Sequence, residues 1–132
     1  MNPSLDNAPH PRGDLCLQTL AMPGDANPNG DIFGGWLVSQ MDLAGGVAGR
    51  KRARGRIATV AIDSMVFLRP LKVGDIVGFY TEVLSVGRSS IKILVEVWKT
   101  DDLTGRHTKL TEGLFTFVAI DDDGKTRPVP PA

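Results

Sequence analysis

Four long segments of period two follow the only helical candidate of this chain, and that order leaves few folds open to it. The segments cover residues 57–68, 76–86, 89–100 and 107–120, and apolar and polar side chains largely alternate in each of them. This alternation predicts strands of about ten residues or more, which is long for a strand. The links between the segments are short and rich in Gly, Pro and Asp, so consecutive strands are expected to pair antiparallel.

The helical candidate covers residues 35–51, contains no Pro and carries apolar side chains on most of its faces. We expect such a helix to be buried, because a surface helix keeps one polar face. A short strand is predicted before it at residues 15–21, followed by a loop of turn residues. No second helical segment is available to cover the concave face of the sheet. The expected fold is therefore α+β, with a curved antiparallel sheet wrapped around one long helix.

The chain has 132 residues, the usual size of one domain, and no break in composition divides it. We expect one domain over residues 1–132. The two ends, residues 1–14 and 121–132, are rich in Pro, Asp and Gly and are expected to be mobile. A layer of this kind leaves helix and sheet edges that a small monomer covers poorly, so a dimer or a larger oligomer is the expected state.

The charge and hydropathy of the chain exclude two classes of partner. It carries 15 Lys and Arg against 15 Asp and Glu, a formal net charge of zero. Without a long-range positive field, we expect no nucleic-acid partner. No run of about 18 apolar residues is present that could cross a bilayer, so no membrane partner is expected. The first residues are polar and lack the apolar segment of an export signal, which predicts a cytoplasmic protein.

Few residues offer metal or nucleophile chemistry. Cys16 is the only cysteine, cannot form an internal disulfide, and lies in an alternating segment where a core position is expected. His10 and His107 have no Cys, Asp or His neighbour at metal-ligand spacing, so we expect no metal site. The nucleophile elbow, P-loop and dinucleotide-binding motifs are absent as well. Nucleophilic catalysis by a Ser-His or Cys-His arrangement is therefore not expected.

Small and polar residues form one stripe along the helical candidate. Their spacings are four, three, four and three residues, and the stripe consists of Gly35, Ser39, Asp42, Gly46 and Gly49. So many small residues predict the close approach of another backbone, such as the helix of a dimer partner, or of a ligand. A carboxylate in an apolar helix is costly to bury unless it is paired or hydrogen-bonded. Asp42 is therefore either a functional carboxylate or a structural one that bonds a neighbouring group.

The start of the helical candidate offers a second candidate site. Gly34 and Gly35 leave backbone N–H groups free at the positive end of the helix dipole, where a developing oxyanion could be bound. Asp31 lies just before them in the sequence. It is either a functional carboxylate or a loop residue that caps a turn.

Candidate anion-binding residues lie in turns and near the C-terminus. An Arg next to hydroxyl side chains can hold a phosphate, although a solvated surface turn has the same composition. These candidates are Arg88, Ser89, Ser90, Arg69, Lys125 and Arg127.

Four blocks of sequence follow one another between about residue 15 and residue 130. They are TLAMPGDANPNGDIFGGWLVSQMDLAGGVA, VAIDSMVFLRPLKVGD, VGRSSIKILVEVW and EGLFTFVAIDDDGKTRPVP. Together and in this order they resemble the YciA-type acyl-CoA thioesterases of the hotdog-fold superfamily. The resemblance implies a hotdog fold, a long central helix wrapped by a curved antiparallel sheet of about five to six strands. It also implies a homodimer as the minimal unit and a hexamer built as a trimer of dimers.

For function, the resemblance implies hydrolysis of acyl-coenzyme A to a carboxylic acid and free coenzyme A, with no cofactor besides the coenzyme A of the substrate. Asp42 of the SQMD run stands where the family has a catalytic aspartate, as general base toward water or as nucleophile forming a mixed anhydride. Gly34 or Gly35 is implied to supply the N–H that polarises the thioester carbonyl. Asp31 stands where relatives with a duplicated domain have Asn, so it orients water, assists across the dimer or only shapes the loop.

The resemblance also implies that Arg88, Ser89 and Ser90 contact coenzyme A, with Lys125 and Arg127 as weaker candidates. The main alternative is a hotdog domain that binds acyl-CoA as a sensor without hydrolysing it. A hotdog dehydratase or hydratase would need His in the helix region, where this chain has none. A purely structural protein, in which the small-residue stripe is only a dimer seam, leaves Asp42 unexplained. Apolar pockets discriminate by only about 1–3 kcal/mol per methylene, so a broad acyl-chain preference is expected.

Overall fold

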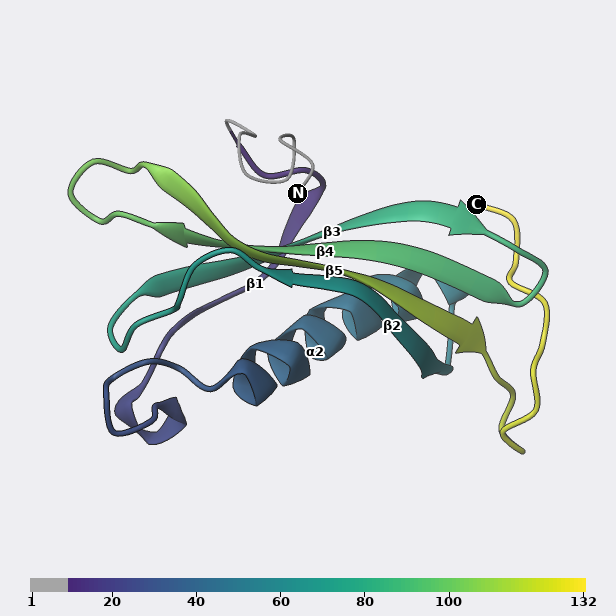
Figure 1. Ribbon diagram of the computed structural model, residues 1–132. Coiled ribbons are helices and arrows are strands. Elements are labelled where there is room, and N and C mark those ends of the chain that lie inside the picture. The colour runs from purple at the N-terminus through teal and green to yellow at the C-terminus, as the bar shows by residue number, and fades with distance from the viewer. Residues whose placement is uncertain (1–9) are drawn as a thin grey trace.

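In a computed structural model, one long helix lies across one face of a curved antiparallel sheet (Figure 1). The structure describes residues 10–132. Its elements in chain order are β1 (Asp14–Leu20), the short 3-10 helix η1 (Pro23–Asp25), α2 (Gly34–Ala53), β2 (Ile57–Phe67), β3 (Ile76–Val86), β4 (Ser90–Thr100) and β5 (His107–Ala119). The five strands have the order β1-β3-β4-β5-β2, and every neighbouring pair is antiparallel. The predicted α+β fold with one central helix is confirmed.

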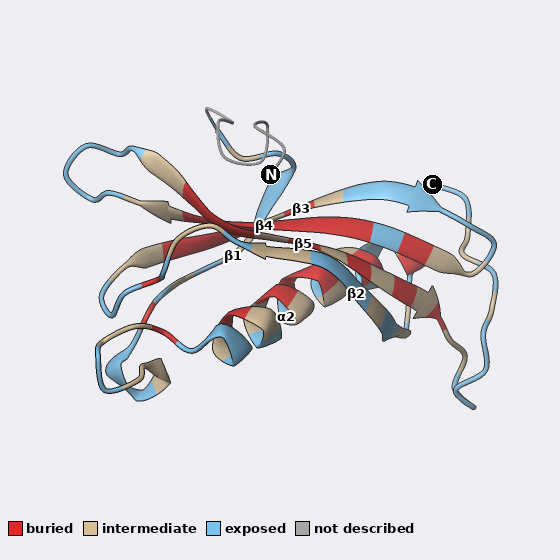
Figure 2. Ribbon diagram, viewed as in Figure 1, coloured by how far each residue is buried: buried red, intermediate tan, exposed pale blue. Residues whose placement is uncertain are grey.

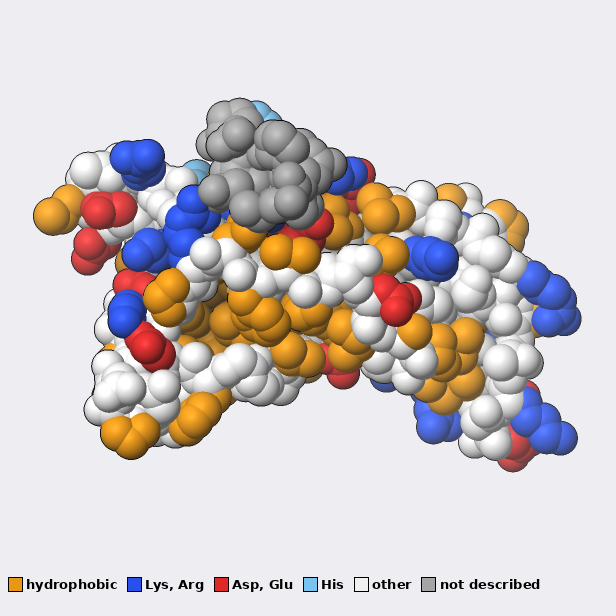
Figure 3. Space-filling model, in the orientation of Figure 1, with side chains coloured by type: hydrophobic (Ala, Val, Ile, Leu, Met, Phe, Trp, Pro, Cys, Tyr) orange, Lys and Arg blue, Asp and Glu red, His pale blue; other side chains and the backbone are white. Residues whose placement is uncertain are grey.

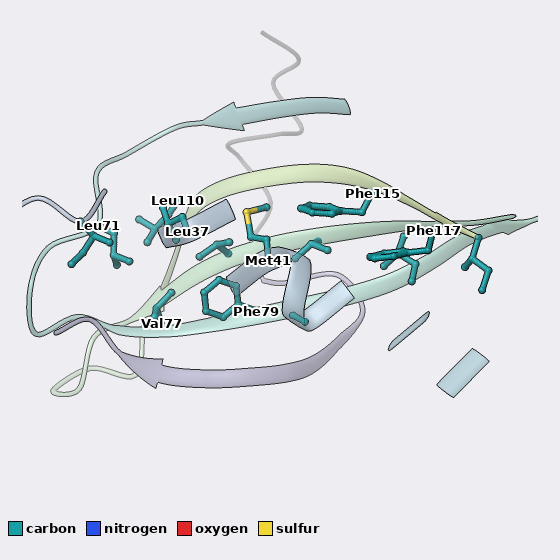
Figure 4. Close-up of a cluster of buried hydrophobic side chains, with 14 of the residues drawn as sticks. Leu37, Met41, Leu71, Val77, Phe79, Leu110, Phe115 and Phe117 are labelled. Atoms are coloured by element: carbon teal, nitrogen blue, oxygen red, sulfur yellow. The ribbon is translucent and has the colours of Figure 1, made fainter. Parts of the chain in front are cut away.

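The core fills the space between α2 and the sheet. Leu37 and Met41 of α2 point into the same layer as Phe79, Phe115 and Phe117 of the strands (Figure 4). From Thr111 to the end of β5, buried residues alternate with less buried ones, as period two requires (Figure 2).

The helix is less buried than its sequence predicts. Leu43 and Val47 are 54% and 38% exposed, because the single sheet of one chain covers only one side of α2. The expectation of a helix buried on most faces is thus wrong for one chain taken alone.

Exposed apolar side chains also mark the edge strand β2. Val60, Ile62 and Phe67 are 56%, 41% and 51% exposed. Since β2 is the last strand in the sheet order, one side of its backbone has no strand neighbour within the described part of the chain. Hydrophobic side chains gather on the face of the molecule that carries β2 and α2 (Figure 3). An unpaired edge with apolar side chains is a template for association with another chain.

The C-terminal segment departs from the expectation of a mobile end. Within residues 121–132, the N–H of Arg127 donates to the carbonyl of Ala119 at 3.0 Å and that of Val129 to Arg88 at 2.7 Å. Both bonds tie the segment to the sheet. Of the N-terminal end, residues 1–9 lie outside the described residues, and Arg12 forms an ion pair with Glu82.

Cys16 does not occupy the fully buried core position that its sequence predicts. Cys16 is only partly buried: it packs at the margin of the core, and its thiol donates to the carbonyl of Ala44 at 3.3 Å. Among residues 10–132, no helix has the length and apolar character needed to cross a membrane.

Candidate active site

Asp42 lies in the middle of α2, at the side where β2 passes the helix. Its Oδ1 accepts a hydrogen bond from the hydroxyl of Thr59 in β2 at 2.7 Å. Asp42 is half-buried, Thr59 is exposed, and no ion pair links Asp42 to another described residue. One carboxylate oxygen is thus held in place, and the other is free of hydrogen bonds to the described part of the chain. A carboxylate fixed in this way can accept a proton from a water molecule.

The small-residue stripe around Asp42 faces two different surroundings. A Cβ added at Gly49 would lie 2.7 Å from Cδ1 of Ile57, so the chain's own β2 makes this close approach. A Cβ at Gly35 or Gly46 would meet no atom of the described residues within 4 Å. Ser39 is turned away from Asp42, because its hydroxyl donates to the carbonyl of Trp36 at 2.7 Å. Only part of the stripe is therefore open to a ligand or to another chain.

The N-terminus of α2 is exposed and has no side-chain cap. The cap residue is Phe33, and the first helical N–H groups that find a carbonyl are those of Trp36 and Leu37. The N–H groups of Gly34 and Gly35 make no hydrogen bond to any of residues 10–132. Two free donors at the positive end of a helix can bind an oxyanion.

A cavity of about 270 Å³ lies beside this helix start. Its lining is mostly apolar and consists of Ile32, Gly34, Leu37, Phe67, Leu68, Arg69, Pro70 and Leu71. Arg69 is the only charged residue in the lining, and its Nη1 donates to the carbonyl of Lys109 at 2.6 Å. Sequence reasoning grouped Arg69 with the anion-binding turns, whereas the structure places it at the other end of α2, near the free N–H groups.

Asp31 does not contact Asp42. Its carboxylate forms an ion pair with Lys72, and its N–H donates to Oδ1 of Asn27 at 3.1 Å. The same Asn27 oxygen also accepts from the N–H of Asn29 at 2.9 Å. Asp31 therefore belongs to the folded loop before α2, and Asn27 is the residue that orders this loop.

The remaining candidates lie together at the C-terminal end of α2. Ser90 begins β4, and the turn before it holds Arg88 and Ser89. The C-terminal segment reaches this turn through the hydrogen bond from Val129 to Arg88. Basic side chains lie at this end of the molecule and also at the opposite end (Figure 3).

Lys125 and Arg127 belong to that C-terminal segment. The Nε of Arg127 donates to the carbonyl of Ile120 at 3.0 Å, and Lys125 is exposed. The structure thus brings five of the six anion-binding candidates to one end of the sheet and leaves out Arg69.

Known proteins match this chain over most of its length. The profile described as Thioesterase superfamily matches residues 29–106. The chain belongs to this thioesterase superfamily. It is 49% identical over 130 residues to the acyl-CoA thioester hydrolase YciA of Salmonella typhimurium, and the match covers 96% of each chain. The resemblance to YciA-type thioesterases and the expected hotdog fold are confirmed.

Solved thioesterases have the same fold as this one. The hexameric thioesterase of Yersinia pestis superposes with a TM-score of 0.88 at 50% identity, covering 93% of this chain and 100% of that chain. The acyl-CoA hydrolase of Staphylococcus aureus, solved with butyryl coenzyme A, coenzyme A and coenzyme A disulfide, has a TM-score of 0.83 at 32% identity. That match covers 86% of this chain and 70% of that chain. Structures of its alanine variants at one aspartate, one threonine and one asparagine are also known.

Sequence reasoning about this thioesterase missed two residues, the hydrogen-bond partner of Asp42 and the residue that orders the loop before α2. Thr59 lies 17 residues from Asp42 in a different element, so no local pattern connects the two. Asn27 carried a usable signal, because Asn in a turn-rich loop often bonds the backbone two residues further on. The basic run at residues 50–56 was also left without a role, although its five Lys and Arg contain no acidic residue between them.

Proposed function

We propose that this chain hydrolyses acyl-coenzyme A thioesters to a carboxylic acid and free coenzyme A, with Asp42 at the centre of the reaction. The observation that carries the proposal is the half-buried carboxylate of Asp42, fixed by Thr59, in a member of the thioesterase superfamily. The YciA relatives are named acyl-CoA thioester hydrolases, which supports the same substrate class here.

Asp42 acts as a general base toward water. Thr59 holds Oδ1, which leaves Oδ2 to accept the proton of the attacking water. The leaving thiolate needs little help from an acid, because thiols are acidic compared with alcohols. Direct attack by Asp42, giving a mixed anhydride, is the competing route, and it uses the same side chain.

The oxyanion site comes from a second copy of the chain. Gly34 and Asp42 are separated by eight residues, which is about 12 Å along a helix at 1.5 Å per residue. One thioester carbonyl cannot bind the N–H of Gly34 or Gly35 and also lie next to a water on Asp42 of the same chain. We infer a homodimer joined along the exposed edge of β2, with the helix start of one copy facing Asp42 of the other. The solved relative from Yersinia pestis is described as hexameric, and a trimer of dimers is the proposed assembly.

Coenzyme A phosphates bind at the C-terminal end of α2. Arg88, Ser89 and Ser90 lie there together with the segment that carries Lys125 and Arg127. Arg69 lines the cavity at the helix start, so it contacts the substrate closer to the thioester than the other anion-binding candidates do. No metal and no cofactor other than the coenzyme A of the substrate takes part, and the proposed location is the cytoplasm.

The known variants of the staphylococcal hydrolase support this choice of residues. The asparagine, aspartate and threonine replaced there have the same spacing along that chain as Asn27, Asp42 and Thr59 have here. Asn27 thus joins the proposed site through the loop before α2. Asp31, paired with Lys72, shapes this loop and takes no direct part in the reaction.

Thiol release from acyl-coenzyme A tests the proposal. Wild type, Asp42→Ala and the control Asp102→Ala, an exposed aspartate in the β4–β5 turn, are compared on thioesters from acetyl to palmitoyl. We expect Asp42→Ala to lose about 10²-fold to 10⁴-fold in turnover, the usual contribution of a general base, and Asp102→Ala to keep its activity. Equal thermal melting of the three proteins shows that the fold is intact.

Two results would contradict the proposal. Asp42→Ala with most of its activity would remove that residue from the chemistry. Tight calorimetric binding of coenzyme A without turnover of any thioester by the wild type would favour the alternative, a sensor domain for acyl-coenzyme A.

A further inference from the structure

A second cavity lies on the flank of α2 that faces away from Asp42. Its volume is about 540 Å³, and it is bounded by the start of β1, the last turns of α2 and the second half of β3. Lys51, one of its lining residues, follows Asp42 by nine residues, which is about two and a half turns of an α-helix. The two side chains therefore point to opposite sides of α2. This cavity is separate from the candidate active site, and its size is that of a ligand pocket, within about 300–1,000 Å³.

The walls of this cavity are largely apolar. They include Val47 and Ala48 of α2, Cys16 of β1 and Val83 of β3. Val47 and Val83 are 38% and 39% exposed, so their apolar surface is open to a ligand. A hydrocarbon chain that covers such a surface is stabilised there because apolar area is removed from water.

Thr81 brings a polar group to this apolar cavity. The residue is only 8% exposed, yet it lines the cavity. Its hydroxyl makes no hydrogen bond to any other residue of the described range 10–132. This hydroxyl is not among the fully buried unpartnered polar atoms of the described residues, so it is open to the cavity and can bond an oxygen atom of a ligand.

Among residues 10–132, the charges around the cavity leave an excess of one positive charge. Four charged residues line it: Asp14, Lys51, Arg52 and Glu82. The Nε and Nη2 of Arg12 donate to Glu82 at 3.0 and 3.2 Å and neutralise it. Arg52 donates to a backbone carbonyl of the C-terminal segment at 2.6 Å, which leaves its charge uncompensated. Lys51 is exposed and forms no ion pair within residues 10–132, so the two cations outweigh Asp14.

We propose that this cavity binds an alkyl carboxylate, with the hydrocarbon chain on Val47 and Val83 and the carboxylate between Lys51 and the hydroxyl of Thr81. Carboxylic acids of this class are the products of the proposed hydrolysis, so the source of the ligand rests on the proposed function. The site itself rests only on the cavity and its lining. It would hold the product against the helix that carries Asp42, outside the active site.

Cys16 offers a direct readout of occupancy, because it lines the cavity and is the only cysteine of the chain. The rate of its alkylation by iodoacetamide is followed by mass spectrometry as sodium decanoate is added below its micelle concentration. Wild type and Asp42→Ala are both measured, with desulfo-coenzyme A present to occupy the active site, since it lacks the thiol that iodoacetamide would consume. We expect saturable slowing in both proteins. Decanol, which has the same chain without the charge, should require up to about fivefold higher concentrations, since an exposed ion pair contributes up to about 1 kcal/mol.

Two charge reversals make the test specific. Lys51→Glu should raise the half-protecting concentration of decanoate by about fivefold or more. Lys92→Glu, at an exposed lysine of β4 outside the cavity lining, should leave that concentration unchanged. The charge of Lys51 also lowers the pKa of the Cys16 thiol. The alkylation rate of each variant with decanoate is therefore compared with the rate of the same variant without decanoate.

The proposal is overturned if decanoate gives no saturable protection, or if Lys51→Glu and wild type share one half-protecting concentration. Its failure can be told apart from failure of the proposed function. Protection of Cys16 needs no turnover, and the thiol-release assay does not depend on this cavity.

Discussion

The hydroxyl of Thr59 donates a 2.7 Å hydrogen bond to Oδ1 of Asp42 and so joins β2 to the only carboxylate of α2. The bond fixes the rotamer of a side chain that is otherwise half-exposed, and it leaves the second carboxylate oxygen available. We propose Thr59 as a positioning residue for Asp42, since its hydroxyl is directed at the carboxylate.

Removing this hydroxyl should lower activity more than stability. A hydrogen bond to a charged acceptor contributes about 1.5–3 kcal/mol, so Thr59→Val is expected to lower kcat/KM about tenfold to a hundredfold. Thr59 is exposed, and thermal melting should change little. Thr59→Ser keeps the hydroxyl and should retain most of the activity. Equal rates for the Val and Ser variants would show that the hydrogen bond does not serve the reaction.

The period-two segments predicted the sheet well, because alternation records which face of each strand is buried. The segment at 107–120 became β5 (His107–Ala119), and 76–86 became β3 (Ile76–Val86). The sequence predicted the ends of the helix less accurately than the ends of these strands. Helix α2 extends to Ala53, where Arg54 adopts a left-handed conformation with φ of 55°, and the sequence predicted an end at residue 51.

Contacts between distant segments could not be predicted from local patterns. The C-terminal segment has the composition of a mobile end, yet its backbone bonds Ala119 and Arg88. The link between Asp42 and Thr59 depends on how β2 crosses α2, which spacing within one element does not encode. Asp42 itself stands out in the sequence, because a lone carboxylate in an apolar helix needs an explanation, and its catalytic role stays a prediction.

Lys109 is a second point at which one substitution should have a large effect. Its Nζ lies 2.9 Å from Oε2 of Glu96 and 2.6 Å from Oε1 of Glu112, and the side chains of Lys109 and Glu96 are 3% and 1% exposed. Within residues 10–132, Oε2 of Glu96 is held only by this ion pair, whereas Oε1 accepts from the N–H of Arg12 and from Nε1 of Trp98. The lysine is thus the counter-ion of two glutamates.

Lys109→Met should lower the free energy of unfolding by about 3–5 kcal/mol, because it leaves buried carboxylates without a counter-ion. Urea unfolding at a fixed protein concentration measures the change. The triple variant Lys109→Met, Glu96→Gln, Glu112→Gln removes all three charges and should recover much of the loss. A loss below about 1 kcal/mol for Lys109→Met alone would mean that the ion pairs contribute little.

The pH dependence of Cys16 alkylation should lie at higher pH than that of a free thiol. Burial raises the pKa of the Cys16 thiol, and the positive charge of Lys51 opposes part of that rise. The folded state thus disfavours the thiolate. Its stability should fall as the pH rises above the pKa of the unfolded thiol, about 8.5.

Alkylation of Cys16 should therefore increase through a higher pH range than alkylation of N-acetylcysteine. Lys51→Glu should move the profile to still higher pH, and Lys92→Glu should not. Rates of iodoacetamide labelling between neutral and alkaline pH measure both effects. Coincidence of the wild-type profile with that of the free thiol would contradict the burial of this side chain.

Two adjacent glycines of α2 should respond to alanine in opposite directions. A Cβ at Gly45 would lie 3.0 Å from Cζ of Phe117 and 3.4 Å from Val95, whereas a Cβ at Gly46 would meet no atom within 4 Å. Phe117 is 1% exposed and stacks on Phe115 with ring centroids 6.2 Å apart, so its ring has little room to move. Close packing at Gly45 is thus intolerant of an added methyl group.

Gly45→Ala is expected to lower the free energy of unfolding by about 1–3 kcal/mol through overpacking. Gly46→Ala should raise it by about 0.5–1 kcal/mol, because alanine restricts the unfolded chain and favours the helix. Urea unfolding of both variants gives the two signs, and size-exclusion chromatography gives their assembly. A smaller assembly for Gly46→Ala would show that a second copy approaches α2 at Gly46, in which case the gain in helix stability would be offset by lost contacts between chains.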